Sequence, residues 1–309
     1  MELFDLHCDT LCEGLHNHIT IRQNTGHIDL VRGEQFTSWI QTFACWLPDD
    51  IPTEQSQAEC FALLNLAYTW EQQEQNYRII RTAEDIIYPK RGCNALLTVE
   101  NGGVLGDDLA IISRLSKLGV RAITLTWNGD NAWASGCFGN PKRGLTETGR
   151  KALTEMETYG VLPDVSHINE VGFWDVLSYT HGPILATHAA SKTIHDHPRN
   201  LSDEQFCAIR DRGGLVGLCL YPEHLGGSDM EQIRRHLEHF LSLNGDKTLC
   251  FGADFDGMTA PCEWNGVSVM KKIKQHLSHH GWTNEQLDAV FYTNARNFFV
   301  RHWTQTNKE

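Results

Sequence analysis

Six side chains that could bind metal ions or handle protons stand at or just after short apolar runs of the sequence. His7 and Asp9 are two residues apart, and alternate side chains of a β-strand point to the same side. Imidazole nitrogens and carboxylate oxygens are common ligands of zinc and similar divalent ions, so this pair is half of a metal site. The other four residues follow separate apolar runs: Glu100, His167, His188 and Asp254.

As a set, these residues suit hydrolysis assisted by two metal ions, which lie about 3.5–4 Å apart in such enzymes. One division of the set is a first ion held by His7 and Asp9, a second held by His167 and His188, a carboxylate shared between them from Glu100, and a free proton acceptor at Asp254. Any one of these residues alone is more simply a polar residue at a strand end. The joint pattern over five strands favours a site.

The remaining histidines are interpreted differently. Most of them, including His224 and His236, fall in helical or loop segments and are predicted to be solvated. His195 and His197 are spaced like a ligand pair, but they lie in a predicted loop before Pro198, which argues against a metal site there.

Apolar runs alternate with segments of helical periodicity along the whole chain. Eight runs are predicted as strands, at residues 3–6, 39–46, 95–99, 122–127, 161–165, 183–187, 215–220 and 249–253. Helices are predicted at residues 56–76, 108–118, 146–159, 169–179, 202–211, 230–243, 267–277 and 284–299. This alternation predicts an α/β fold, a (β/α)8 TIM barrel formed by one domain over residues 1–309. In such barrels the catalytic residues stand at the carboxyl ends of the strands, where the six candidates fall.

Composition excludes several classes of protein. The formal net charge of −13 disfavours nucleic acid as a partner, because phosphate binding needs basic patches. No apolar stretch approaches the ~18 residues of a membrane span, so no membrane partner is expected. The N-terminus runs straight into His7 and leaves no room for a signal peptide, which predicts a cytoplasmic protein with reduced cysteines. Phosphate-binding glycine motifs and the G-x-S-x-G elbow are both missing, which disfavours nucleotide-dependent enzymes and serine hydrolases.

Five segments of the chain resemble the signature blocks of the membrane (renal) dipeptidase family. They are Asp-Leu-His-Cys-Asp-Thr at residues 5–10, Thr-Val-Glu-Asn-Gly-Gly at 98–103, Asp-Val-Ser-His at 164–167, Thr-His-Ala-Ala-Ser at 187–191 and Phe-Gly-Ala-Asp-Phe-Asp-Gly at 251–257. The blocks occur in the family's order, and the separation of two histidines fits as well (188 − 167 = 21). The last block is the most specific, and the resemblance extends from Asp5 to the predicted helix at 284–299.

The resemblance implies a binuclear zinc dipeptidase on an amidohydrolase-type barrel, which would also act on dipeptides with a C-terminal D-residue. It implies the following roles: His7 and Asp9 on one zinc, His167 and His188 on the other, Glu100 bridging the two, and Asp254 as the acid and base. A site of nitrogen and oxygen ligands also accepts manganese, cobalt or iron. The expected partner is a small dipeptide substrate, and a homodimer is left open.

Two more residues acquire a role from the resemblance. The family holds the terminal carboxylate of the dipeptide with an arginine eleven residues after the last histidine ligand, and Arg199 stands there (199 − 188 = 11). A planar guanidinium suits a carboxylate. Tyr221 matches a tyrosine that lines the family's pocket. Without the resemblance, Arg199 would be interpreted as a surface loop residue and Tyr221 as a packing residue.

Trp127 departs from the family, whose better-studied members have a histidine there that is thought to stabilise the oxyanion. A tryptophan can donate one N–H but cannot accept or titrate. Asn128 or Asn131 could offset the change, so Trp127 and Asn128 are kept as candidate substrate-binding residues. The departure supports one alternative, an amidohydrolase of the same barrel that acts on a lactone, a cyclic amide or an N-acyl amino acid. A metal-binding protein without catalysis is a second alternative, although it would not need Asp254.

Overall fold

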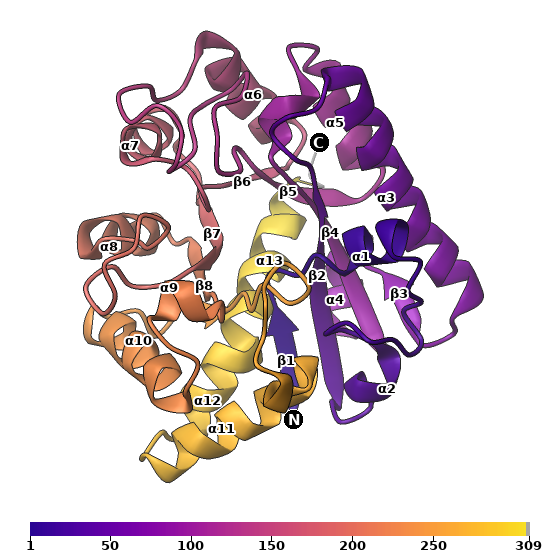
Figure 1. Ribbon diagram of the computed structural model, residues 1–309, viewed down its shortest axis with the longest axis vertical. Coiled ribbons are helices and arrows are strands. Elements are labelled where there is room, and N and C mark those ends of the chain that lie inside the picture. The colour runs from indigo at the N-terminus through magenta and orange to yellow at the C-terminus, as the bar shows by residue number, and fades with distance from the viewer. Residues whose placement is uncertain (307–309) are drawn as a thin grey trace.

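The computed structural model describes residues 1–306, in which parallel strands form a closed barrel surrounded by helices (Figure 1). Because β2 pairs with both β1 and β4, the strand order runs back on itself and closes. The predicted (β/α)8 barrel is therefore confirmed. Its strands are β1 (Glu2–Asp5), β2 (Ser38–Trp46), β4 (Cys93–Glu100), β5 (Val120–Thr124), β6 (Leu162–Asp164), β7 (Leu185–Ala189), β8 (Leu215–Leu218) and β9 (Leu249–Phe251).

A ninth strand, β3 (Tyr77–Ile79), was not predicted. It pairs with the first residues of β4, on the edge that β5 takes over from Leu97 onward. A three-residue strand carries too little periodicity to be recognised in a sequence. Several predicted strand ends are also wrong by one to three residues. Two of these differences concern the candidate site. Glu100 and His188 were predicted to follow their strands, but Glu100 is the last residue of β4 and His188 lies within β7.

Helices follow most strands and form the outer layer of the barrel (Figure 1). They are α1 (Thr10–His16), α2 (Leu30–Gly33), α3 (Thr53–Gln73), α4 (Ala83–Ile87), α5 (Ala110–Lys117), α6 (Glu147–Thr158), α7 (Glu170–Tyr179), α8 (Asp203–Asp211), α9 (Pro222–Leu225), α10 (Met230–Ser242), α11 (Val269–His279), α12 (Asn284–Asp288) and α13 (Asn294–Thr306). Side chains cap several of them, as when Ser202 accepts a hydrogen bond from the backbone N–H of Gln205 at the start of α8. The helix predicted at 284–299 is interrupted by a π-helical turn at Ala289–Thr293.

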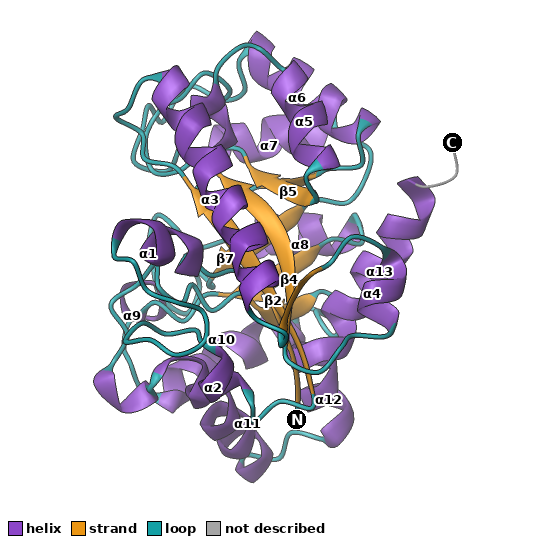
Figure 2. Ribbon diagram, turned by 90° about the vertical axis from the view of Figure 1, so that its right-hand side faces the viewer, coloured by secondary structure: helices purple, strands orange, loops and turns teal. Residues whose placement is uncertain are grey.

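The amino end of the barrel is filled by apolar side chains. Phe4 and Leu6 of the first strand region pack in one buried cluster with Phe298, Phe299 and Trp303 of α13. The rings of Phe4 and Phe299 stack with their centroids 5.4 Å apart. Figure 2 shows α13 and α4 on one side of the strands, with α1 and α9 on the other side. Polar chemistry is therefore left to the opposite, carboxyl end.

The described residues contain no helix that is both long enough and apolar enough to cross a bilayer. All ten cysteines lie within the described residues and are unpaired, and seven of them are buried.

Candidate metal centre

The six predicted residues meet at the carboxyl end of the barrel, and each is at most 7% exposed. They come from five separate parts of the chain, so only the closed barrel brings them together. Their positions are as follows: His7 and Asp9 just after β1, Glu100 at the end of β4, His167 after β6, His188 in β7 and Asp254 after β9.

Glu100 lies between the two pairs of candidate ligands. One of its carboxylate oxygens, Oε2, is 3.2 Å from His7 Nε2. The other, Oε1, is 2.8 Å from His167 Nε2 and 3.6 Å from His188 Nε2. Asp9 Oδ2 completes the first group at 3.4 Å from His7 Nε2. Two triplets of potential metal ligands therefore share the Glu100 carboxylate, and a third triplet joins His7 and His188 to Asp254.

The donor atoms fit divalent cations. His7 Nε2 and Asp9 Oδ1 are buried and have no hydrogen-bond partner among the described residues. An unsatisfied buried polar atom costs about 1–3 kcal/mol, which a bound cation would relieve. The Asn128 side-chain oxygen accepts a hydrogen bond from His167 Nδ1 at 3.0 Å, which fixes the imidazole tautomer. The lone pair of His167 Nε2 therefore points toward Glu100 Oε1 and His188 Nε2, each 2.8 Å away, and a cation could be bound among these three atoms.

Burial and charge set the protonation of these groups. Burial, together with the charge of Arg199, holds the pKa of His167 well below its usual range. Burial also lowers the pKa of His188, so both imidazoles are neutral at pH 7 and keep their lone pairs. Burial disfavours a charged His7 too, but Glu100 and Asp9 outweigh it and raise the pKa of His7 well above its ordinary value. The part of the site formed by His7, Asp9 and Glu100 therefore favours a bound positive charge.

Asp254 differs from the ligands in its surroundings. Burial, together with the nearby charges of Asp9 and Glu100, raises the pKa of Asp254 to about 8 against the opposing positive charges of His7 and Arg199. Its Oδ1 lies 3.8 Å from His7 Nε2, close enough to face the same centre. A carboxyl group that holds a proton near neutral pH suits acid and base catalysis.

The backbone around the site contains two strained residues and one position that only glycine can occupy. His167 and Asp254 both adopt left-handed conformations, with φ of 67° and 66°, which non-glycine residues rarely adopt. Such strain concentrates at functional sites. Gly257 shows a steric requirement, because an added Cβ would lie 2.1 Å from Asp9 Oδ2 and 2.6 Å from Asp254 Oδ1. A side chain at that position would displace both carboxylates.

Asp164 is a positioning residue that sequence reasoning missed. Its buried carboxylate accepts hydrogen bonds from the Thr124 hydroxyl at 2.5 Å and from the Thr187 hydroxyl at 2.6 Å. It also accepts from the backbone N–H groups of Ser166 and Thr187, both at 3.0 Å. Thr187 in turn contacts His188 Nδ1 at 3.0 Å. Asp164 therefore joins the ends of β5, β6 and β7 beneath the histidines.

The centre opens into a pocket of about 510 Å³. All four predicted substrate-binding residues line this pocket: Trp127, Asn128, Arg199 and Tyr221. Arg199 is only 5% exposed, and its Nε has no hydrogen-bond partner among the described residues. Arg199 is therefore not the surface loop residue that the sequence would indicate without the resemblance.

Several other expectations are corrected. Asn131 does not line the pocket, because its amide donates to Asn101 and accepts from the backbone N–H of Trp133. It shapes the loop after β5 and cannot replace a lost oxyanion donor. His224 and His236, predicted to be solvated, are 6% and 0% exposed. Their burial depends on tertiary packing, for which the sequence gives no local signal.

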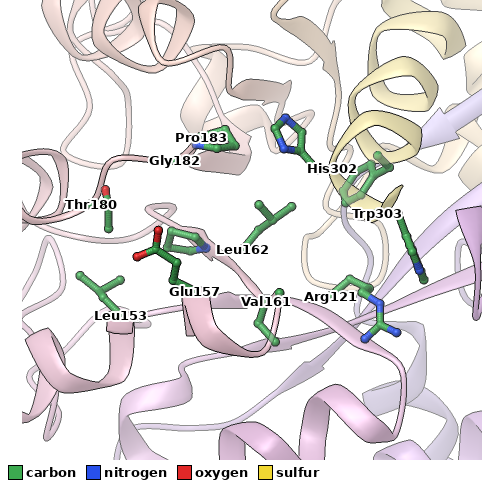
Figure 3. A pocket seen from close by; sticks show the side chains of 13 residues that line it. Arg121, Leu153, Glu157, Val161, Leu162, Thr180, Gly182, Pro183, His302 and Trp303 are labelled. Carbon is green, nitrogen blue, oxygen red and sulfur yellow. The ribbon is translucent and has the colours of Figure 1, made fainter. Parts of the chain in front are cut away.

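A second pocket, of about 200 Å³, lies at the closed end of the barrel next to α13 (Figure 3). Its lining is mainly apolar and includes Leu153, Leu162, Pro183, Phe299 and Trp303. Among the described residues, no group of potential metal ligands borders it. The candidate catalytic residues therefore lie at the first pocket and not at this one.

A parallel barrel with a shared-carboxylate ligand cluster at its carboxyl end defines a metal-dependent barrel hydrolase. The sequence model of the membrane dipeptidase family (peptidase family M19) matches residues 1–308, and the chain belongs to that family of metallopeptidases. The predicted family and enzyme class are thus confirmed.

Relatives agree with this assignment. An uncharacterized dipeptidase of Schizosaccharomyces pombe is 27% identical over 308 residues, which cover 91% of this chain and 73% of the relative. An uncharacterized protein in the pqqA 5′ region of Klebsiella pneumoniae is 32% identical over 220 residues, or 67% of this chain and 81% of the relative. The crystal structure of a metallopeptidase from Rhodobacter sphaeroides, with a phosphinate mimic of L-Ala-D-Ala, matches with a TM-score of 0.91 and 25% identity. That match covers 98% of this chain and 99% of the other.

Proposed function

We propose that the protein is a two-metal dipeptidase that hydrolyses the peptide bond of free dipeptides. The observation that carries the proposal is the position of Glu100, which offers one oxygen to His7 and the other to His167, in the same pocket as Arg199. One ion would be held by His7, Asp9 and Glu100, and the other by Glu100, His167 and His188. Bound divalent ions, of which zinc fits this ligand set best, supply Lewis acidity that activates water and polarises a carbonyl group.

Asp254 is proposed as the residue that moves the proton. Its carboxylate would take a proton from the attacking water and return it to the nitrogen of the leaving amine. Burial and the neighbouring carboxylates raise the pKa of Asp254 to about 8, which supports a role in which this carboxyl holds a proton. A bound cation would lower that pKa and so favour the basic form before attack.

Arg199 is proposed to hold the terminal carboxylate of the substrate. It brings a buried positive charge with a free Nε into the pocket, while Asp9 and Glu13 bring carboxylates to the side near β1. A dipeptide is a zwitterion, so its charges match the two sides of the pocket. The match also limits substrates to two residues, because a longer chain would move its carboxylate away from the reacting carbonyl.

The Rhodobacter sphaeroides relative binds a mimic of L-Ala-D-Ala, and we extend acceptance of a C-terminal D-residue to this protein. A lactone or a cyclic amide fits less well, because neither needs carry the carboxylate that Arg199 would bind. An N-acyl amino acid carries that carboxylate but has no ammonium group to match Asp9 and Glu13 on the other side of the pocket. The alternative amidohydrolase activity is therefore not favoured.

A substrate screen with matched metal analysis tests the proposal. Purified zinc-loaded protein should contain two ions per chain and should cleave L,L- and L,D-dipeptides, with no turnover of tripeptides, lactones or N-acyl amino acids. Chelation should abolish the activity, and zinc should restore it. Cleavage of lactones without cleavage of dipeptides would refute the assignment.

The role of Asp254 is tested by Asp254→Asn. The variant should lose at least about a hundredfold in kcat while it retains its metal content, because only the proton transfer is removed. The matched control is Asp211→Asn on the surface of α8, which should leave kcat unchanged. If Asp254→Asn turned over as fast as the wild type, another group would have to carry the proton.

A further inference from the structure

We infer that Trp46 and Trp127 together form a subsite for the side chain of the N-terminal residue of the dipeptide, and that this subsite selects large apolar side chains. The inference rests on the proposed dipeptidase function and adds the substrate preference. Trp46 had no assigned role from the sequence, and Trp127 was considered only as a replacement for a histidine.

The two indoles meet edge to face on either side of Glu100. Trp46 is the last residue of β2 and is paired in register with Glu100, the last residue of β4. Trp127 follows β5, the next strand around the barrel. The ring centroids of the two tryptophans are 5.1 Å apart, and their planes are inclined by 78°. This contact fixes both rings as one aromatic surface next to the metal ligands.

The aromatic surface belongs to the pocket wall. Both tryptophans line the 510 Å³ pocket, and both are only partly buried. Trp46 packs against the hydrophobic core, and the ring of Trp127 contacts the rings of Trp46 and His167, so both indoles are held by packing. Exposed aromatic surface is costly in water, and an apolar ligand group in the pocket would cover it.

The barrel places Trp46, at one end of this surface, opposite Arg199. The closed strand order is β1, β2, β4, β5, β6, β7, β8, β9 and back to β1. In this ring β2 is four strands from β7 in either direction, so Trp46 stands across the mouth from the loop that carries Arg199. The metal ligands lie between the two sides.

This placement determines how a dipeptide would lie in the pocket. With its carboxylate on Arg199 and its peptide carbonyl at the ligand cluster, the N-terminal residue extends toward β1 and β2. Consecutive Cα atoms are only about 3.8 Å apart, so the N-terminal side chain lies close to the ligand cluster and within reach of this wall. Asp9 and Glu13 lie on the same side and suit the N-terminal ammonium group. The side chain is thereby directed to Trp46 and Trp127.

The preference is measured with two dipeptide series in the zinc-loaded enzyme. For Phe-Ala against Ala-Ala, wild-type kcat/KM should be at least about tenfold higher for Phe-Ala, since a buried aromatic ring is worth more than the ~1.4 kcal/mol that tenfold represents. Trp46→Ala and Trp127→Ala should each reduce that ratio below about threefold. The ratio for Ala-Phe against Ala-Ala, which varies the C-terminal residue, should be the same in the Trp46→Ala variant and the wild type.

Two further variants keep the result interpretable. Trp46→Leu retains an apolar side chain that packs against the core and should give an intermediate ratio, which separates substrate contact from misfolding. Trp174→Ala removes a tryptophan that is 38% exposed on α7 and should leave both ratios unchanged.

The outcomes separate the two proposals. If no dipeptide is cleaved by zinc-loaded wild type, the proposed function fails and this inference falls with it. If dipeptides are cleaved but Trp46→Ala retains the full preference for Phe-Ala, only the subsite is refuted. If Trp46→Ala changed only the ratio for Ala-Phe against Ala-Ala, the subsite would also be refuted, because the C-terminal residue of the substrate would then lie against Trp46.

Discussion

His236 offers a test of how the pocket loops are held in place. The side chain is 0% exposed on α10, and its Nδ1 accepts a hydrogen bond from the backbone N–H of Ser191 at 3.0 Å. Its Nε2 donates to the carbonyl oxygen of Leu225 at 3.1 Å. Ser191 begins the loop that carries Arg199, and Leu225 ends the helix that follows Tyr221. One neutral imidazole therefore anchors both loops of the carboxylate-binding side.

The structure gives the sign and size of a pH effect. Burial lowers the pKa of His236 from 6.5 to about 4. The unfolded chain thus takes up a proton below pH 6.5, while the folded protein resists protonation until about pH 4. Above pH 6.5, His236 is neutral in both states and does not change the free energy of unfolding. As the pH falls from 6.5 to 4, protonation of the unfolded chain lowers the free energy of unfolding. A shift of about 2.5 units at about 1.36 kcal/mol per unit amounts to about 3 kcal/mol at pH 4.

His236→Gln should remove this pH dependence. The glutamine amide can accept from Ser191 and donate to Leu225, and it does not titrate. Relative to the wild type, the variant should therefore gain about 3 kcal/mol in the free energy of unfolding between pH 7 and pH 4. Denaturant titrations of both proteins at several pH values give this difference, in which the other histidines cancel.

His236→Ala and a surface control complete the experiment. His236→Ala leaves the Ser191 N–H buried without a partner, so it should lose about 1–3 kcal/mol at pH 7 and raise KM for dipeptides through displacement of Arg199. His279→Gln, on the exposed side of α11, should show no such pH effect. If the stability difference between His236→Gln and wild type stayed constant from pH 7 to pH 4, the neutral anchoring role would be wrong.

Two further predictions concern the metal ligands. Asp164→Asn should weaken metal binding about 10–100-fold, because Asp164 orders Thr187 and Ser166 around His188; calorimetric zinc titration measures this, and unchanged affinity would contradict it. Gly257→Ala should lower kcat at least about tenfold with little loss of secondary structure, because its Cβ would lie 2.1 Å from Asp9 Oδ2. Circular dichroism and kinetics test the second change, with Gly182→Ala, where no atom lies within 4 Å, as the control.

The fold and the candidate ligand set were predictable for a common physical reason. Strands of a parallel barrel are buried on both faces, so they are apolar runs, and the polar residue that ends each run marks the carboxyl end. His7, Glu100 and Asp254 could be recognised in this way. The resemblance to a family added Arg199, which stands in a loop where no periodicity points to it.

The features that sequence reasoning missed depend on contacts between distant segments. Asp164 gains its role from hydroxyl groups on two neighbouring strands, and nothing adjacent in sequence indicates five donors. The contact between Trp46 and Trp127 arises because β4 lies between their strands. The left-handed backbone of His167 also has no local signal, since glycine or asparagine is the usual residue there.

The apolar plug formed by Phe298, Phe299 and Trp303 has a kinetic consequence. Because apolar side chains fill the amino end of the barrel, the substrate and both products would pass through the same pocket opening at the carboxyl end. The amino acid released from the C-terminal side of the dipeptide keeps its α-carboxylate, which is the group that Arg199 would bind in the substrate. This product should therefore compete with the next dipeptide for Arg199. We expect the enzyme to be inhibited as free amino acids accumulate.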